Sequence, residues 1–152
     1  MNEARTPPQN VDAEVSVLGA ILREPIATHE VIASGLKAED FYYERHQLIY
    51  GAMLALYGEG KAPDCVLVAA ELKARGDTER SGAPDSLTHL WEQVPSAANL
   101  KHYIRLVREA AMLRRLIATC RRGEDAGFAA EGKPAEIIDA VSHEVYRVAL
   151  DA

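Results

Sequence analysis

The sequence predicts an all-α fold, with a compact globule of short helices followed by a protruding antiparallel helical hairpin. Apolar residues recur at helical spacing along most of the chain, and no alternating strand pattern persists. Glycine and proline divide residues 10–95 into short helical stretches. Two longer helical stretches then flank a glycine-rich break within residues 96–150. These patterns favour a globular subdomain over 10–95 and a hairpin over 96–150, after a disordered tail of residues 1–9.

The predicted globule begins with a helix that Asn10 can cap, because its side chain can accept a bond from a free N–H group of the first turn. Asp12 and Glu14 suit the positive end of the helix dipole, and Pro25 stops the helix. The apolar face consists of Val11, Val15, Leu18, Ile21 and Leu22. Four further short helices are expected to end at Gly35, at Gly58 or Gly60, at Gly76 and at Pro95. The polar residues 77–86 predict a turn between the last two.

A longer helix is predicted from residue 96, with Ser96 or Asn99 as its cap, to about Arg122. Its apolar residues fall into two neighbouring arcs that together cover about half of the circumference. A helix that packs against a single core needs a narrower apolar face, so this helix is expected to bury two faces. The break that follows contains Gly123, Gly127, Gly132 and Pro134.

The last helix carries a coiled-coil-like seam of Ile138, Val141, Val145 and Val148 at 3-4-3 spacing. With the long helix it forms an antiparallel hairpin that has little core of its own, so its second apolar face predicts contact with another subunit. The residues expected on the hairpin and dimer faces are Leu106, Leu113, Ile117, Ile138, Val141 and Val145.

Charge is unevenly distributed along a chain whose net charge is −6. Between Leu100 and Arg122, seven basic residues stand against Glu109 alone. The basic stripe Lys101, Arg105, Arg108 and Arg115 could contact DNA, but the rest of the chain is strongly acidic, whereas nucleic-acid readers usually carry a basic footprint over the whole domain. A solvated face, or ion pairs with acidic neighbours, is favoured.

Other features narrow the class of protein further. The chain has no apolar run long enough for a membrane span, its polar start lacks the apolar region of a signal peptide, and Cys65 and Cys120 are isolated, which together favour a cytoplasmic protein. The five histidines match no metal-ligand spacing, and no nucleophile motif is present, so neither a metal site nor a catalytic site is expected. The aromatic stretch "EDFYY" at 39–43 could stack on bases, but core packing is favoured.

The segment "GEGKA" at 58–62 resembles a phosphate-binding loop only superficially. Ala62 stands where the P-loop motif needs serine or threonine, and Ala55 where it needs its first glycine. The segment is also expected to end a helix instead of joining a strand to a helix. No nucleotide cofactor is therefore expected in this chain.

Three segments carry a family resemblance: "PPQNVDAEVSVLGAIL" (7–22), "EDFYYERHQLIYGAMLALYGEG" (39–60) and "VPSAANLKHYIRLVREAAMLRRLI" (94–117). They resemble the N-terminal domain of DnaB-type replicative DNA helicases, in register over nearly the whole chain. "SGAPD" at 81–85 replaces the family's usual glycine pair.

The resemblance implies a function through binding. In the family, hairpins of neighbouring subunits pair, the N-terminal domains build a ring as a trimer of dimers, and the C-terminal domain of primase docks on this collar. Carried over by position from "LRRLI", the primase-facing candidates are Leu116, Ile117, Arg121 and Arg122. A helicase loader is a further candidate partner, and DNA is expected to bind only weakly here.

The resemblance also implies that this chain is a piece of a longer helicase. ATP and Mg²⁺ are expected only in the missing motor domain, so this piece is not expected to hydrolyse ATP. Two other functions remain open: a nucleic-acid-binding helical module that uses the basic stripe, and a stand-alone replication adaptor or loader without a motor.

Overall fold

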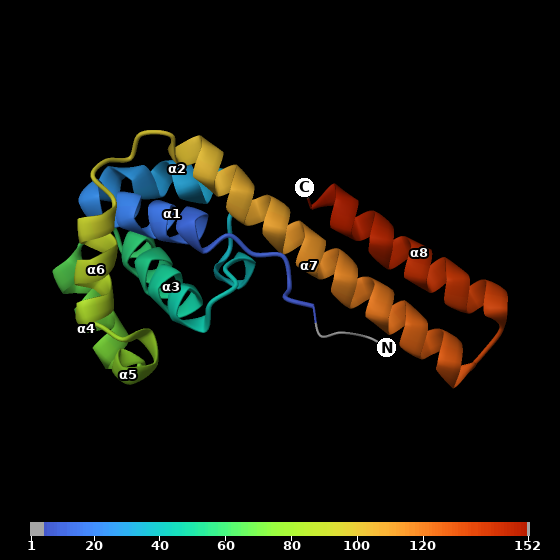
Figure 1. Cartoon of the computed structure of the whole chain (residues 1–152). Helices are drawn as coiled ribbons and strands as arrows, with labels where there is room; N and C mark the ends of the chain where they lie inside the picture. The colour runs from blue at the N-terminus through green and yellow to red at the C-terminus, as the bar shows by residue number, and fades with distance from the viewer. Residues whose placement is uncertain (1–4, 152) are drawn as a thin grey trace. The chain divides into compact units, whose positions relative to one another are not determined.

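The computed structural model describes residues 5–151, which are mostly α-helical and contain no β-strand within that range (Figure 1). These residues form two compact units. The first spans Asn10–Val107, and the second combines the described residues before Asn10 with those from Arg108 onward. The predicted all-α class is confirmed.

The first unit contains six helices and the start of a seventh. The α-helices are α1 (Val11–Arg23), α2 (Thr28–Ala33), α3 (Glu44–Gly58), α4 (Cys65–Ala74), α5 (Thr78–Ser81), α6 (Asp85–Gln93) and the first turns of α7 (Leu100–Ala129). Two 3₁₀ turns, η1 (Pro25–Ala27) and η2 (Ala38–Asp40), connect the first three helices.

The helix ends follow the capping residues of the sequence. The Asn10 side chain accepts a hydrogen bond from the backbone N–H of Ala13 at 2.9 Å, which confirms the predicted cap of α1. The α3 helix ends at Gly58, and Gly60 follows with a φ of 75° that favours glycine. The segment at 58–62 therefore ends a helix, as predicted, and has no strand before it.

The core of this unit is built mainly from α1 and α3, with α4, α6 and the start of α7 packed against them. Phe41 and Tyr50 are fully buried with ring centroids 5.0 Å apart, and the Tyr50 hydroxyl donates to the Leu36 carbonyl oxygen at 2.8 Å. Phe41 thus packs in the core, as favoured from the sequence. Helices α1 and α6 approach closely at Gly19, where an added Cβ would lie 2.3 Å from Val94 Cγ2.

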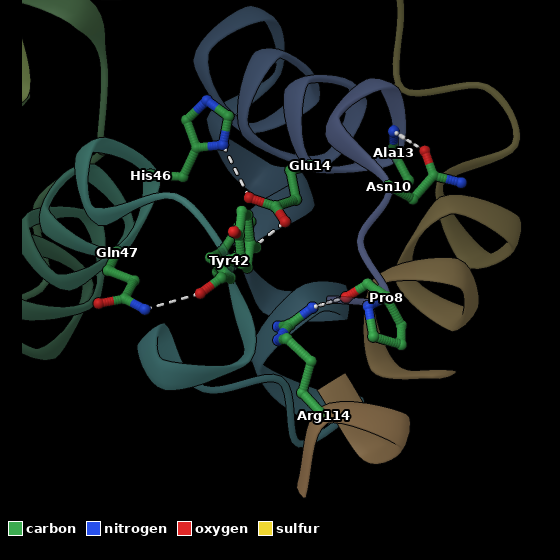
Figure 2. Close-up of polar contacts among 9 residues, drawn as sticks. Pro8, Asn10, Ala13, Glu14, Tyr42, His46, Gln47 and Arg114 are labelled. Atoms are coloured by element: carbon green, nitrogen blue, oxygen red, sulfur yellow. Dashed lines mark hydrogen bonds and ion pairs between the residues drawn. The ribbon is translucent and has the colours of Figure 1, made fainter. Parts of the chain in front are cut away.

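A buried polar contact connects α1 to the start of α3. Glu14 lies in the first turn of α1, as expected, but its side chain is only 1% exposed. One carboxylate oxygen lies 2.8 Å from His46 Nδ1, and the other accepts from the backbone N–H of Tyr42 at 2.9 Å (Figure 2). Nothing in the spacing of the acidic residues indicates this burial.

Two sequence predictions about helices are wrong. Residues 77–86 are not only a turn, because they include α5, which Arg80 stabilises through ion pairs with Asp77 and Glu44. The long helix does not end near Arg122 but continues through two glycines to Ala129. Each glycine inside a helix costs only about 1 kcal/mol, which neighbouring helical turns can offset.

Candidate oligomerisation surface

The second unit contains α7 from Arg108 onward and α8 (Pro134–Leu150), two antiparallel helices that lie side by side as a hairpin in Figure 1. Their connection includes Ala130 and Gly132, with φ values of 51° and 97°. Pro134 then occupies the first turn of α8, where its missing N–H leaves no helical bond unmade. The predicted hairpin is present, with a shorter connection than the sequence suggested.

The two helices meet closely at Gly123. A Cβ added there would lie 3.0 Å from Val141 Cγ1, so the absence of a side chain lets α8 approach. Next to this contact, Arg122 Nε donates to Glu144 Oε2 at 3.3 Å and Arg122 Nη2 donates to Thr119 Oγ1 at 3.1 Å. At this point Gly123 and Arg122 of α7 therefore make the contacts with α8.

Two further arginines of α7 bind backbone carbonyls within the same unit. Arg108 Nη2 donates to the carbonyl oxygen of Asp151 at 3.4 Å, near the end of α8. Arg114 Nη1 donates to the carbonyl oxygen of Pro8 at 2.8 Å (Figure 2). Of the predicted tail of residues 1–9, residues 1–4 lie outside the described residues, and Pro8 is half-buried beside α7.

The outer face of α7 exposes a row of large side chains. Leu113, Leu116 and Ile117 are 49%, 36% and 39% exposed, and Cys120 is also exposed. Their spacing of three and four residues places them on one side of the helix. We call Leu113, Leu116, Ile117 and Cys120 the α7 stripe. Thr119, by contrast, is only 2% exposed.

The α8 helix adds exposed apolar area of its own. None of its residues is buried, and four large side chains are exposed: Ile138, Val145, Tyr146 and Leu150. Ile137, Val141 and Val148 are half-buried. A two-helix hairpin cannot bury a seam on both of its sides, so these apolar atoms stay in water unless a further molecule covers them.

The six predicted interface residues are divided among different environments. Val141 packs at the close approach to Gly123, whereas Leu106 is half-buried against the core of the first unit. The other four are exposed: Leu113, Ile117, Ile138 and Val145. The sequence did not single out Phe128, which is 84% exposed, because its segment was expected to break the helix.

The four residues of the basic stripe predicted from the sequence differ in their exposure to solvent. Lys101 and Arg105 are exposed, and Arg105 Nη2 lies 3.1 Å from His102 Nδ1. Arg108 and Arg115 are half-buried. Of the predicted primase-facing residues, Leu116 and Ile117 belong to the α7 stripe. Arg121 is exposed and Arg122 is paired with Glu144.

Neither metal chemistry nor a membrane span is indicated by the described residues. Within residues 5–151, no three histidine, cysteine or carboxylate side chains gather closely enough to hold a metal ion. No helix in that range is long and apolar enough to cross a membrane.

Comparison with known proteins identifies the domain type. Residues 6–109 match the family model described as the DnaB-like helicase N terminal domain. The replicative DNA helicase DnaB of Mycobacterium leprae is 44% identical over 147 residues, which are 95% of this chain and 24% of that protein. The DnaB helicase of Geobacillus stearothermophilus is 39% identical over 145 residues, or 32% of its length. The chain therefore spans about a quarter to a third of these relatives.

Solved structures agree with this assignment. The crystal structure of the N-terminal domain of DnaB helicase from Mycobacterium tuberculosis superposes with a TM-score of 0.88 at 41% identity, covering 93% of this chain and 99% of that one. A structure of a DnaB-like replicative helicase and its interactions with primase matches with a TM-score of 0.75 at 28% identity, covering 90% of this chain and 31% of that one. The chain therefore belongs to the family of DnaB-like helicase N-terminal domains.

Proposed function

We propose that this chain is the oligomerisation and primase-docking domain of a replicative DNA helicase that unwinds the duplex at the replication fork. Its likeness to DnaB N-terminal domains supports the assignment to a replicative helicase. The single observation that carries the role in assembly is the exposed α7 stripe beside an α8 helix without a buried side chain. In this proposal, residues 10–95 form the globular subdomain and residues 96–150 the dimerisation hairpin.

The assembly step rests on the burial of apolar area. Fully burying a leucine, isoleucine or valine side chain contributes about 1.5–3 kcal/mol relative to leaving it exposed. Leu113, Ile117, Ile138 and Val145 supply four such side chains from each copy. These side chains are only 36–65% exposed in the single chain, so the eight side chains of a pair contribute roughly 6–11 kcal/mol, which is comparable to an association cost of about 4–15 kcal/mol. Three such dimers would form a closed hexamer with cyclic symmetry.

Primase docking is the second part of the proposal. Leu116 and Ile117 offer an apolar anchor, and the exposed Arg121 offers a charged neighbour on the same helix. Arg122 is a weaker candidate because it is engaged with Glu144 and Thr119. The likeness to a helicase described with its interactions with primase supports this partner. A helicase loader is a further candidate partner.

The rest of the helicase would supply the chemistry. ATP and Mg²⁺ would bind in a motor domain, and this chain would position the motors and recruit primase, which couples unwinding to priming. A protein with this role would act in the cytoplasm. We expect this domain to contact DNA only weakly.

The main alternative is a nucleic-acid-binding module that uses Lys101, Arg105, Arg108 and Arg115. The half-burial of Arg108 and Arg115 disfavours it, because phosphate contacts need accessible cations. That alternative predicts that the affinity for DNA falls steeply as the salt concentration rises and that the Arg105→Ala variant no longer binds DNA. The third hypothesis is a stand-alone adaptor or loader without a motor domain. A gene that continues past Ala152 into the P-loop motif GxxxxGK[ST] would exclude it, because that motif belongs to a motor.

The test of docking is a titration of the C-terminal domain of primase into this chain by calorimetry. The proposal predicts saturable binding that Leu116→Asp and Arg121→Ala each weaken, with thermal unfolding of each variant showing that the fold is retained. Arg75→Ala on α4 is the matched control and should bind as the original chain does. Absence of binding, or equal weakening by the control, would contradict primase docking here.

A further inference from the structure

A cavity in the first unit contains several polar groups that the proposed function does not use. It lies between α1, α3 and α6, has a volume of about 410 Å³, and belongs entirely to the unit spanning Asn10–Val107. Its lining consists of Val15, Arg45, His46, Gly82, Asp85, Ser86, His89 and Leu90. This volume falls within the range of roughly 300–1,000 Å³ that is usual for small-molecule sites.

The cavity has a buried floor and a charged rim. Ser86, His46 and Leu90 are buried, whereas Arg45 and Asp85 are exposed. Ser86 is 9% exposed, and its hydroxyl has no hydrogen-bond partner among the described residues. A buried hydroxyl without a partner costs stability, so a ligand that bonds to it would recover that cost.

The two charged groups of the rim have no ion-pair partner within residues 5–151, and they are not paired with each other. Gly82 lets Arg45 come close, because a Cβ added at this position would lie 3.2 Å from the guanidinium carbon. The cavity therefore offers donors from Arg45 and acceptors from Asp85 on one rim. A simple anion would satisfy only Arg45 and would be repelled by Asp85.

The buried carboxylate of Glu14 orients the imidazole of His46, which lies on the floor of the cavity. It lies 2.8 Å from Nδ1 of His46, which leaves Nε2 as the ring nitrogen available to a ligand. His89, also on the rim, is engaged through Nε2 with the Gln93 side chain at 2.8 Å and keeps Nδ1 available. The cavity thus combines donors and acceptors from charged and imidazole groups with the apolar side chains of Val15 and Leu90.

We propose that this cavity binds a purine base of the guanine type. Guanine presents acceptors at O6 and N7, which suit an arginine fork, and donors at N1 and the exocyclic amine, which suit a carboxylate. Its flat ring suits the apolar floor and the imidazoles. The base can come from a free nucleotide or from a single DNA or RNA strand, and the proposal does not depend on the role of the hairpin.

The test is a titration of GMP into the ¹⁵N-labelled chain at constant ionic strength, followed by NMR. Saturable shifts are expected at the amides of Arg45, Ser86 and His89, with weaker binding of AMP and none of inorganic phosphate. Because the base and not its phosphate is bound, added salt should change the affinity little, by less than about twofold.

Variants separate this site from a general charge effect. Arg45→Gln and Asp85→Asn should each weaken GMP binding by at least about tenfold, because each removes a paired set of hydrogen bonds to a charged group. Arg75→Gln removes the same charge from α4, outside the cavity, and should leave the affinity unchanged. Thermal unfolding of each variant shows whether the fold is retained.

Two outcomes identify the source of the base. Tighter binding of a short guanine-containing strand than of GMP indicates a single strand as the source. Tighter binding of GMP than of the strand indicates a free nucleotide. Other outcomes overturn the proposal. These are the absence of saturable shifts, equal binding of inorganic phosphate and GMP, or an equal loss in Arg45→Gln and Arg75→Gln. Oligomer formation is measured separately, so the two proposals can fail independently.

Discussion

Glu14 and His46 are 32 positions apart in the sequence but form a buried contact in which Nδ1 of the histidine lies 2.8 Å from a carboxylate oxygen. The second carboxylate oxygen accepts the backbone N–H of Tyr42. A single side chain of α1 therefore holds the start of α3 and the segment before it. Because the carboxylate is 1% exposed, water cannot replace either partner.

Glu14→Gln should destabilise the chain by about 1–3 kcal/mol, since an amide cannot provide two charge-assisted acceptors at a buried site. Urea denaturation at neutral pH measures the change. Asp12→Asn removes the same charge from an exposed side chain in the same helical turn, and should cost less than about 1 kcal/mol. Equal losses in the two variants would mean that the buried contact contributes nothing beyond the helix dipole.

Gly19→Ala tests the close packing of α1 on α6. The added Cβ would lie 2.3 Å from Val94 Cγ2 and 2.7 Å from the Leu90 carbonyl oxygen, and the backbone atom cannot move away without shifting α6. A loss of about 1–3 kcal/mol is expected from such overpacking. Thermal or urea unfolding provides the measurement.

The matched control for this variant is Gly127→Ala in α7. A Cβ there meets nothing within 4 Å, and alanine suits a helix interior better than glycine by about 0.5–1 kcal/mol. The two alanine variants should therefore change stability in opposite directions. A stabilised Gly19→Ala chain would contradict the packing described between α1 and α6.

The two cysteines should differ in alkylation. Partial burial, with a smaller contribution from the charge of Asp64, raises the pKa of the Cys65 thiol, so less of it is thiolate near pH 8. Cys120 is exposed on the α7 stripe and should react faster at low protein concentration. If the stripe is covered by a second copy, the Cys120 rate should fall as the protein concentration rises, whereas the Cys65 rate should not. Mass spectrometry of iodoacetamide-treated chains measures both rates, and a Cys120 rate independent of concentration would count against the stripe.

Local sequence signals predicted much of the first unit. The cap at Asn10, the end of α3 near Gly60 and the burial of Phe41 each depend on a residue type whose preference is strong by itself. These features need no knowledge of the tertiary structure. Periodicity predicted contact with another subunit, but only the family resemblance supplied the identity of the expected partners.

The features that sequence missed depend on tertiary contacts. Gly123 was expected to end a helix, but it lies inside α7 opposite Val141, where a larger side chain would push α8 away. Glu14 was expected only to suit the helix dipole, and its burial depends on the approach of His46 and Tyr42. Which face of α7 meets α8 could also not be predicted, because Gly123 and Arg122, which contact α8, carry no hydrophobic signal.

Sedimentation velocity over an approximately hundredfold concentration range tests the central proposal most directly, because mass action makes assembly depend on concentration. The chain should form a dimer or larger species that dissociates on dilution. Ile117→Asp should be monomeric with its helix content retained. Val66→Asp places the same charge on a more exposed apolar residue of the first unit, 78% against 39%, and should assemble normally. A chain that stays monomeric at every concentration, or an Ile117→Asp chain that assembles like the original, would contradict the assignment of the α7 stripe as an interface.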